Sequence, residues 1–292
     1  MRPFFSIIIP ALNEEKFLPL LLKDISSQTF PRDRLEVIVV DGHSDDQTVQ
    51  KAEEFTSVLP LRIFKDKVRH VSHQRNLGIS KAKGVWSLFM DADTRIPKFF
   101  LDGLKFQIAR HPHVDALTTW VAIEKKSAVI KAIEQAINWG LELYLILGRE
   151  AALGAFMACR TKLAKTHPFD ETTTVCEDVY FIQKLVEENY SFEIYKEPRY
   201  FFSSRRIERE GPLKIVGIAA RIQLGLLLGK DFKTDHMGYV MNGGGYYTKS
   251  ATSPSFPLTN IQKFLKSASA DQIAQVRKTF KRLQALTQEL YQ

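Results

Sequence analysis

Residues 35–46 read LEVIVVDGHSDD, a run of mostly β-branched residues that ends abruptly in a polar turn. Two other stretches have the same form: residues 4–14 read FFSIIIPALNE, and residues 85–93 read VWSLFMDAD. A short, continuous apolar run is typical of a strand that is buried on both faces, as in a parallel sheet. We therefore predict that these runs are central strands, each followed by polar residues at its carboxyl end.

The rest of the first 121 residues continues this alternation of strands and helices. The predicted strands cover residues 4–9, 35–40, 61–64, 85–90 and 114–121, and the predicted helices cover residues 14–28, 46–55, 72–83 and 97–110. Such alternation predicts an α/β fold with a mostly parallel sheet covered by helices on both faces. Ligands bind outside the carboxyl ends of such strands. We therefore expect Asp41, Asp91 and Asp93 to face one cleft.

The composition is that of an ordinary globular protein: 292 residues, 45% hydrophobic and 25% charged, which excludes a disordered or collagen-like chain. The net charge of +8 is unevenly distributed. Residues 199–292 hold 15 Lys and Arg against 6 Asp and Glu, whereas residues 1–198 hold 26 against 27. The C-terminal third is therefore the part expected to meet an anionic partner.

Two common phosphate-binding motifs are missing from the sequence. No G-x-G-x-x-G follows the first strand and no G-x-x-x-x-G-K-[ST] occurs, which disfavours a Rossmann dehydrogenase and a P-loop NTPase. Nucleotide phosphates would then need another counter-charge. Asp91-Ala92-Asp93 offers the carboxylate oxygens that Mg²⁺ or Mn²⁺ prefers, although two aspartates before a helix also serve as caps and turn formers.

Five ordered motifs together resemble the family 2 glycosyltransferases of GT-A fold. They are residues 6–14 (SIIIPALNE), 39–46 (VVDGHSDD), 75–84 (RNLGISKAKG), 89–93 (FMDAD) and 176–178 (CED). The resemblance implies a GT-A domain over residues 1–205, with a nucleotide-sugar-binding half at 1–121 and an acceptor half at 122–205. A basic helical extension would follow at 206–292.

The resemblance also implies roles for single residues in the donor site. Asp41 would read the edge of the base, Glu14 would lie near the ribose, Asp91 would contact the ribose or the metal shell, and Asp93 would ligate the metal. Family members commonly carry a second acidic residue after the first in the Asp41 loop, where this chain has Gly42. The full set of donor-binding candidates is Pro10, Ala11, Asn13, Glu14, Asp41, Arg75, Asp91, Ala92, Arg205 and Arg206, and the metal candidates are Asp93 and Asp91.

The acidic pair Glu177-Asp178 is the candidate catalytic motif. Sugar transfer with inversion needs a carboxylate that deprotonates the acceptor hydroxyl; we assign this role to Asp178, with Glu177 orienting it or the acceptor. The alternative is that both residues only begin a helix whose apolar face starts at Val179.

The arginines also allow two interpretations. Paired guanidinium groups at Arg205 and Arg206 suit a diphosphate, but a solvated loop that pairs with Glu208 and Glu210 fits equally well. Arg75 could lie beside the donor pocket or be an exposed helix residue.

Residues 127–148 predict an amphipathic helix with Ile130 on its apolar face and Asn138 on its polar face. Trp139 and Tyr144 could stack on an acceptor sugar, with burial as the default expectation. His111-Pro112-His113 is expected to form a turn with no carboxylate cluster beside it.

The C-terminal third carries one strongly apolar stretch, residues 213–229, which is too short and too charged for a membrane span. It suits a buried helix or one that lies in a membrane interface. His236 is a further candidate metal ligand, and helices are expected after residues 259 and 271.

We therefore expect a metal-dependent, inverting glycosyltransferase that moves a sugar from a nucleotide-sugar donor, with a UDP-sugar favoured, to an acceptor hydroxyl or lipid phosphate in polysaccharide or glycolipid synthesis. Its expected partners are the donor, a saccharide or lipid-linked acceptor and an anionic membrane surface at the inner face, with no nucleic acid and a cytoplasmic location. The alternatives are a sugar-phosphate nucleotidylyltransferase, which would need a Gly- and Lys-rich phosphate loop, and a basic protein that binds nucleic acid or lipid.

Overall fold

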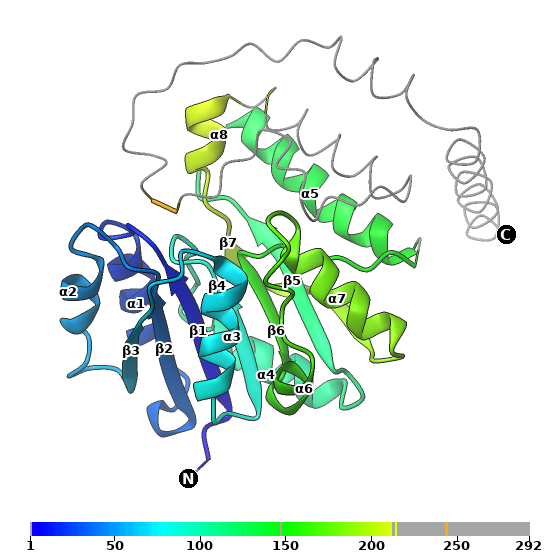
Figure 1. Ribbon diagram of the computed structural model, residues 1–292. Helices are drawn as coiled ribbons and strands as arrows, with labels where there is room; N and C mark the ends of the chain where they lie inside the picture. Colours follow the sequence, from blue (N-terminus) through cyan, green and yellow to red (C-terminus); the bar gives the residue numbers. More distant parts are fainter. Residues whose placement is uncertain (1, 126, 147, 212–213, 215–242, 245–292) are drawn as a thin grey trace, which may run out of the picture.

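The computed structural model describes residues 2–125, 127–146, 148–211, 214, 243 and 244. Their strands form one seven-stranded sheet in the order β3-β2-β1-β4-β6-β5-β7 (Figure 1). The strands are β1 (Phe5–Ala11), β2 (Leu35–Asp41), β3 (Leu61–Lys65), β4 (Trp86–Met90), β5 (Ala116–Ala122), β6 (Phe156–Arg160) and β7 (Phe192–Phe201).

The sheet is parallel apart from one strand, β6, which pairs antiparallel with both β4 and β5. The register at the centre aligns Ile8 of β1 with Ile38 of β2 and Phe89 of β4, and all three side chains are fully buried. The prediction of a mostly parallel α/β sheet is therefore confirmed. The sequence reasoning predicted β1 to β5 but neither β6, which is only five residues long, nor β7, which contains Pro198 and is half exposed.

Helices cover both faces of the sheet. Their bounds are α1 (Leu18–Ser26), α2 (Thr48–Glu53), α3 (Val71–Lys81), α4 (Phe100–Arg110), α5 (Ala128–Ile146), α6 (Thr161–Thr166), α7 (Glu177–Glu187) and α8 (Arg205–Glu210). Apolar residues of α1, α2 and α4 pack on one face of the sheet. Residues of α3, α6 and α7 pack on the other. Because successive strand residues point to opposite faces, Ile7 and Ile8 belong to different core clusters.

The parallel strands β1, β2 and β4 end at the same edge of the sheet, where α5 and α8 lie across their carboxyl ends (Figure 1). Helices α1 and α4 begin several residues later than the sequence predicted, at Leu18 and Phe100. The residues before them, 12–17 and 91–99, form the loops that follow β1 and β4. This arrangement places three polar loops at one edge, as expected for a ligand site in a parallel sheet.

Helix α5 confirms the predicted helix over residues 127–148 but corrects two expectations about its faces. Asn138 is fully buried, where it accepts a hydrogen bond from the backbone N–H of Val121 at 2.8 Å and donates one to its carbonyl at 3.0 Å. Trp139 is 64% exposed, so burial was the wrong default for it, whereas Tyr144 is buried. Asn138 is inside because its amide satisfies backbone groups at a bulge between β5 and β7.

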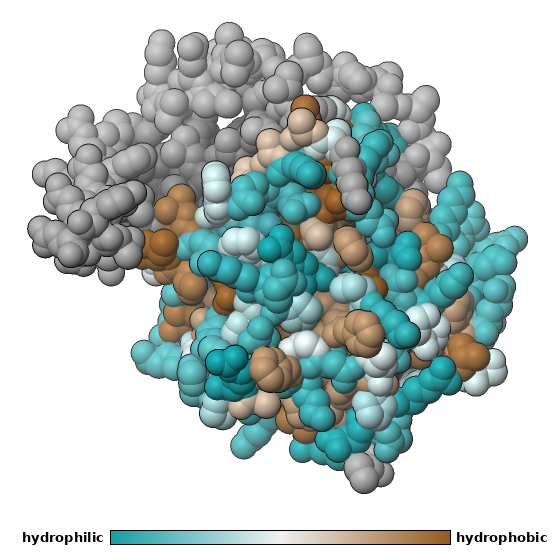
Figure 2. Space-filling model, turned by 180° about the vertical axis from the view of Figure 1, so that it is seen from behind, coloured by the Kyte–Doolittle hydropathy of each residue, from teal (hydrophilic) through white to brown (hydrophobic). Residues whose placement is uncertain are grey.

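Among the helices described, none combines the length and apolarity that crossing a bilayer requires. The apolar stretch at residues 213–229, His236 and the predicted C-terminal helices lie outside the described residues, Lys214 apart. Seen from behind, the molecule is mainly hydrophilic, with apolar side chains in small separate groups (Figure 2). Scattered exposed apolar residues of this kind are normal on a globular surface.

Candidate active site

The first side of the cleft is built by β1 and β2. Ala11 and Asp41 are the last residues of these strands and stand opposite each other in the register. Pro10 and Ala11 are therefore strand residues rather than loop residues, because the ladder extends two residues beyond the apolar run. Asn13 follows with a left-handed backbone (φ 56°), a conformation that asparagine tolerates. Its side-chain oxygen accepts a hydrogen bond from the N–H of Asp45 at 2.7 Å and so ties the two loops together.

Asp41 is 2% exposed, and its carboxylate accepts hydrogen bonds from the backbone N–H and the hydroxyl of Ser44. It thus holds the turn after β2. The departure at Gly42 has a steric reason: a Cβ there would lie 2.2 Å from the side-chain nitrogen of Gln74. That amide donates a hydrogen bond to the carbonyl of Ala11 at 3.0 Å. A larger residue at position 42 would therefore require the Gln74 side chain to move from this hydrogen bond.

Glu14 is buried (6% exposed), with one carboxylate oxygen bound by Arg205 at 2.9 Å and the other, Oε2, without a hydrogen-bond partner among the residues that the structure describes. Burial raises the pKa of Glu14 to about 7; Arg205 opposes this shift, and the charges of Asp93 and Asp91 add to it. A buried carboxylate oxygen without a donor is costly. Glu14 is therefore suited to accept a hydrogen bond from a ligand hydroxyl.

The loop after β4 carries Asp91, Ala92 and Asp93. Both aspartates face arginines: Asp91 accepts a hydrogen bond from Arg75 at 3.1 Å, and Asp93 pairs with Arg205 at 2.7 Å. The pKa of Asp91 is raised to about 6 by desolvation in the cleft, although its side chain keeps 39% of its surface exposed, and by the charges of Asp93 and Glu177. Ala92 is buried between them. The two aspartates are thus cleft residues and not merely helix caps.

Arg75 joins the donor loops to the acidic pair. Its guanidinium is 1% exposed and donates to Glu177 at 2.7 Å, to Asp91 at 3.1 Å and to the carbonyl of Gly154 at 3.2 Å. It also lies 5.4 Å from the ring centre of Phe169. The alternative of an exposed helix residue is therefore wrong: α3 turns Arg75 inward, where three oxygens accept hydrogen bonds from its two terminal nitrogens.

Glu177 and Asp178 are the first two residues of α7, as the alternative interpretation expected, and the catalytic role of the pair stays a prediction. Asp178 accepts hydrogen bonds from the backbone N–H groups of Gly154 and Val179. Burial raises the pKa of Asp178 to about 7; the neighbouring Glu177 adds to the shift and Arg75 opposes it. Glu177 is 5% exposed and bound to Arg75. A carboxylate with a pKa near neutrality is suited to general-base work.

Gly154 is a site residue that the sequence reasoning missed. It precedes β6, and a Cβ there would lie 2.9 Å from the Arg75 guanidinium and 3.3 Å from the Asp178 carboxylate. Its N–H donates to Asp178 and its carbonyl accepts from Arg75. Only glycine fits between these groups. No motif marks it; a predicted strand at 156–160 would have been the signal.

The paired arginines after β7 separate in the structure. Arg205 turns into the cleft, where it bridges Glu14 and Asp93 and lies 4.0 Å from the ring centre of Phe17. Arg206 pairs with Glu210 one helical turn further on, at 3.5 Å. The structure therefore brings Arg205 to the predicted donor residues and places Arg206 on α8.

The cleft gathers five carboxylates around two guanidinium groups. The carboxylates are those of Glu14, Asp91, Asp93, Glu177 and Asp178, and the cations are Arg75 and Arg205. Burial is the main cause of the raised pKa values of Glu14, Asp91 and Asp178, and the neighbouring negative charges add to each shift. A divalent cation beside Asp91 and Asp93 would offset this excess negative charge. The carboxylate oxygens of Asp91 and Asp93 thus fit Mg²⁺ or Mn²⁺, which prefer such ligands.

Comparison with known proteins gives a consistent result. The family model described as "Glycosyl transferase family 2" matches residues 6–171. A poly(ribitol-phosphate) beta-N-acetylglucosaminyltransferase, TarS of Staphylococcus aureus, is 29% identical over 209 residues, which cover 69% of this chain and 36% of that protein. The minor teichoic acid biosynthesis protein GgaA of Bacillus subtilis is 25% identical over 213 residues, covering 69% and 47%. The chain thus spans between a third and a half of these relatives' length.

Solved structures show the same fold. A crystal structure of S. aureus TarS residues 1–349 with UDP aligns with a TM-score of 0.58 and 22% identity, covering 94% of this chain and 81% of that one. The mannosyltransferase PcManGT of Pyrobaculum calidifontis, solved with GDP-Man and Mn²⁺, aligns with a TM-score of 0.62 and 16% identity, covering 100% and 88%. The predicted GT-A fold is confirmed.

Proposed function

Because the chain belongs to glycosyl transferase family 2, we propose that its glycosyltransferase reaction is a metal-dependent, inverting transfer from a nucleotide-sugar donor, with Asp178 as the base. The observation that carries this proposal is the meeting of Asp91, Glu177 and Asp178 around Arg75, with Asp93 close enough to Asp91 to act on its charge. Family membership leaves no role for the nucleotidylyltransferase or the basic interaction protein considered from the sequence.

The donor half of the mechanism rests on β1, β2 and β4. Asn13 and Asp41 hold the two loops that would flank the nucleoside, and Asp41 would have to share its carboxylate between Ser44 and the base. The partnerless Oε2 of Glu14 would accept a hydrogen bond from a ribose hydroxyl. Pro10, Ala11 and Ala92 contribute backbone and small side chains that leave room for the ligand.

Asp93 and Asp91 would hold Mg²⁺ or Mn²⁺, which supplies positive charge to the leaving diphosphate. Arg205 now binds Asp93 at 2.7 Å. The guanidinium fork of Arg205 could instead bind the diphosphate in two-point fashion. Arg205 would thus move from carboxylate to phosphate when the donor binds. Arg206 stays a predicted donor residue, although in the structure it pairs with Glu210.

The transfer step needs a base aligned with the acceptor hydroxyl. Gly154 and Val179 fix both oxygens of Asp178 through backbone N–H groups. The raised pKa of Asp178 makes it a better proton acceptor than an exposed aspartate. As the hydroxyl attacks the anomeric carbon, its proton passes to Asp178 and the nucleoside diphosphate leaves. Glu177, held by Arg75, would orient the acceptor or the base.

For the substrates we propose a UDP-sugar donor and a saccharide or lipid-linked acceptor, in polysaccharide or glycolipid synthesis. TarS supports this choice, since its name states an N-acetylglucosaminyl transfer to poly(ribitol-phosphate) and its structure was solved with UDP. The basic residues of the C-terminal third suit an acceptor that carries phosphate. Trp139, exposed on α5, could stack on an acceptor sugar. The cytoplasmic location and the contact with anionic membrane stay predictions.

The test is calorimetry with UDP and with GDP, in the presence and absence of Mn²⁺, on the parent and on Asp93→Ala. We expect UDP to bind more tightly with Mn²⁺ and this gain to disappear in the variant. Ser80→Ala, a change on the exposed side of α3, is the matched control. Nucleotide binding that is absent, or indifferent to Mn²⁺ and to Asp93, would overturn the metal-dependent mechanism.

A further inference from the structure

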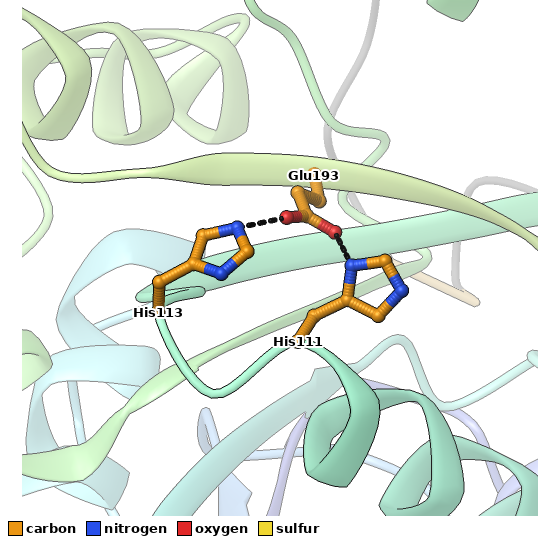
Figure 3. Close-up of side chains that lie close together, drawn as sticks. All are labelled: His111, His113 and Glu193. Atoms are coloured by element: carbon orange, nitrogen blue, oxygen red, sulfur yellow. Dashed lines mark ion pairs between the residues drawn. The ribbon is translucent and has the colours of Figure 1, made fainter.

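A group of side chains that could hold a metal ion lies at the opposite edge of the sheet from the candidate active site. His111 and His113 approach the same carboxylate, that of Glu193, from its two sides (Figure 3). His111 Nδ1 lies 2.9 Å from one oxygen, and His113 Nε2 lies 2.8 Å from the other. The expectation that no carboxylate lies beside these histidines is therefore wrong, because β7 brings Glu193 to them from 80 residues further along the chain.

We propose that His111, His113 and Glu193 form a binding site for Zn²⁺. Their ligand atoms all lie within 4.8 Å of one another. Ligands around tetrahedral zinc, with bonds of about 2.0–2.1 Å, stand about 3.4 Å apart. Rotation of the His113 side chain, which is 68% exposed, closes this difference. Water would fill the fourth position on the exposed side.

The loop that carries the histidines is fixed at each of its three carbonyl groups. The N–H of Val114 donates to His111 O at 3.1 Å, Arg160 donates to Pro112 O at 2.6 Å, and the Ser191 hydroxyl donates to His113 O at 2.6 Å. A site held in this way needs little reorganisation when an ion binds. The exposed pair His167–Glu188, in contrast, has one histidine and no second imidazole facing its carboxylate.

The surroundings of the three side chains favour the binding of a cation. His111 is the C-terminal cap of α4, where the helix dipole attracts positive charge. Its ring packs 5.2 Å from that of Tyr195, which is two residues beyond Glu193 on the same face of β7. Glu193 itself sits in the ladder opposite Leu117 of β5. The ion would join the end of α4 to the start of β7 across the sheet.

The proposed zinc site differs in its ligands from the metal site proposed at Asp91 and Asp93, and it lies far from it. Two imidazoles and one carboxylate suit zinc, whereas the carboxylates of Asp91 and Asp93 suit Mg²⁺ or Mn²⁺. The histidines precede β5, and the cleft lies at the carboxyl ends of the strands. The seven residues of β5 place about 20 Å between the two edges. The zinc site therefore does not depend on the proposed reaction.

Titration of the chelator-treated full chain with Zn²⁺ in excess Mg²⁺, followed by calorimetry, tests the site. We expect the parent to bind one zinc ion per chain at this cluster. In His113→Ala and in Glu193→Gln we expect the zinc affinity to fall more than about tenfold. His167→Ala, which removes a histidine–glutamate pair elsewhere in the chain, should bind as the parent does. His113 is exposed, so its replacement leaves the core intact.

A second readout uses Co²⁺, whose visible absorption reports tetrahedral coordination. The band should form in the parent and in His167→Ala and be lost in His113→Ala and Glu193→Gln. Zinc should also raise the midpoint of thermal unfolding of the parent and of His167→Ala, but not of the two cluster variants. No zinc binding at micromolar concentration, or equal binding in the parent and the two cluster variants, would overturn the proposal.

Discussion

Two arginines each bridge a pair of carboxylates in the cleft, but they do so in different settings. Arg75 joins Asp91 to Glu177 and is 1% exposed, on a helix that packs against the central strands. Arg205 joins Glu14 to Asp93 and is 14% exposed, at the first residue of α8. The same ion-pair chemistry is fixed in the core in one case and accessible to ligand in the other. In the proposed mechanism, Arg75 is therefore a positioning residue and Arg205 is the arginine that changes partners.

The largest effect is expected at the base that the Arg75 bridge positions. Asp178→Asn keeps the size of the side chain and one of its two hydrogen bonds from backbone N–H groups, because an amide has a single acceptor oxygen, and it removes the ability to accept a proton. We expect sugar transfer to fall by about 10²–10⁴-fold, with donor affinity close to that of the parent. Initial rates with a UDP-sugar, together with calorimetry, measure both. Turnover near that of the parent would move the base to another residue.

Breaking the buried bridge should affect folding itself. Arg75→Met leaves Glu177 and Asp91 without their cation, and removing one partner of a buried ion pair costs about 3–5 kcal/mol. Urea unfolding should show this loss as a lower midpoint, and Arg75→Lys should recover part of it. A Met variant as stable as the parent would mean that water already compensates these carboxylates, and that Arg75 does not organise the cleft.

Replacing Arg205, which bridges Glu14 and Asp93, should weaken nucleotide binding more than it lowers the stability of the fold. Arg205→Met removes the fork proposed to bind the diphosphate, and charged hydrogen bonds of this kind contribute about 1.5–3 kcal/mol. We expect UDP affinity to fall by roughly 10–100-fold, while the unfolding midpoint changes less than in Arg75→Met. Arg206→Met, one residue on, is the matched control because its guanidinium pairs with Glu210. Equal losses in the two variants would assign both arginines to the donor.

The pH profile sharpens the comparison further. Below its pKa of about 7, Asp178 holds a proton and cannot accept another, so kcat/KM should rise with pH and level off above that value. At pH 6 we expect about a tenfold loss relative to the plateau. Glu14 and Asp91, with pKa values raised to about 7 and 6, act in the same direction on donor binding. Measuring kcat at saturating donor separates the base from these two, and a flat kcat profile would contradict the assignment to Asp178.

The sequence predicted the donor side of the cleft better than the catalytic side. Strands β1, β2 and β4 were found because residues buried on both faces form continuous apolar runs, and Asp41, Asp91 and Asp93 follow directly from where those runs end. Strands β6 and β7 were missed, and with them Gly154 and Glu193. Strand β7 gives no continuous apolar run, because only Phe192, Tyr195 and Tyr200 are buried in it and it contains Pro198.

The histidines show the same limit from the other direction. His111-Pro112-His113 was correctly seen as a turn, but its carboxylate partner lies in a strand that the sequence reasoning had not placed. The faces of α5 were predicted from hydropathy. Asn138 is an exception, because its side-chain amide forms two hydrogen bonds with the backbone of Val121 in β5 and is buried there. In each case a contact distant in sequence decided the role of the residue.

The sequence by itself determined the family, the α/β sheet and the identity of the acidic residues, because strand burial and motif order are properties of neighbouring residues. Only the tertiary structure decided which cations meet which carboxylates. Arg75 reaches Glu177 across 102 positions and Arg205 reaches Glu14 across 191. Electrostatic and hydrogen-bond energies depend on separation in space, and the fold sets that separation independently of distance along the chain.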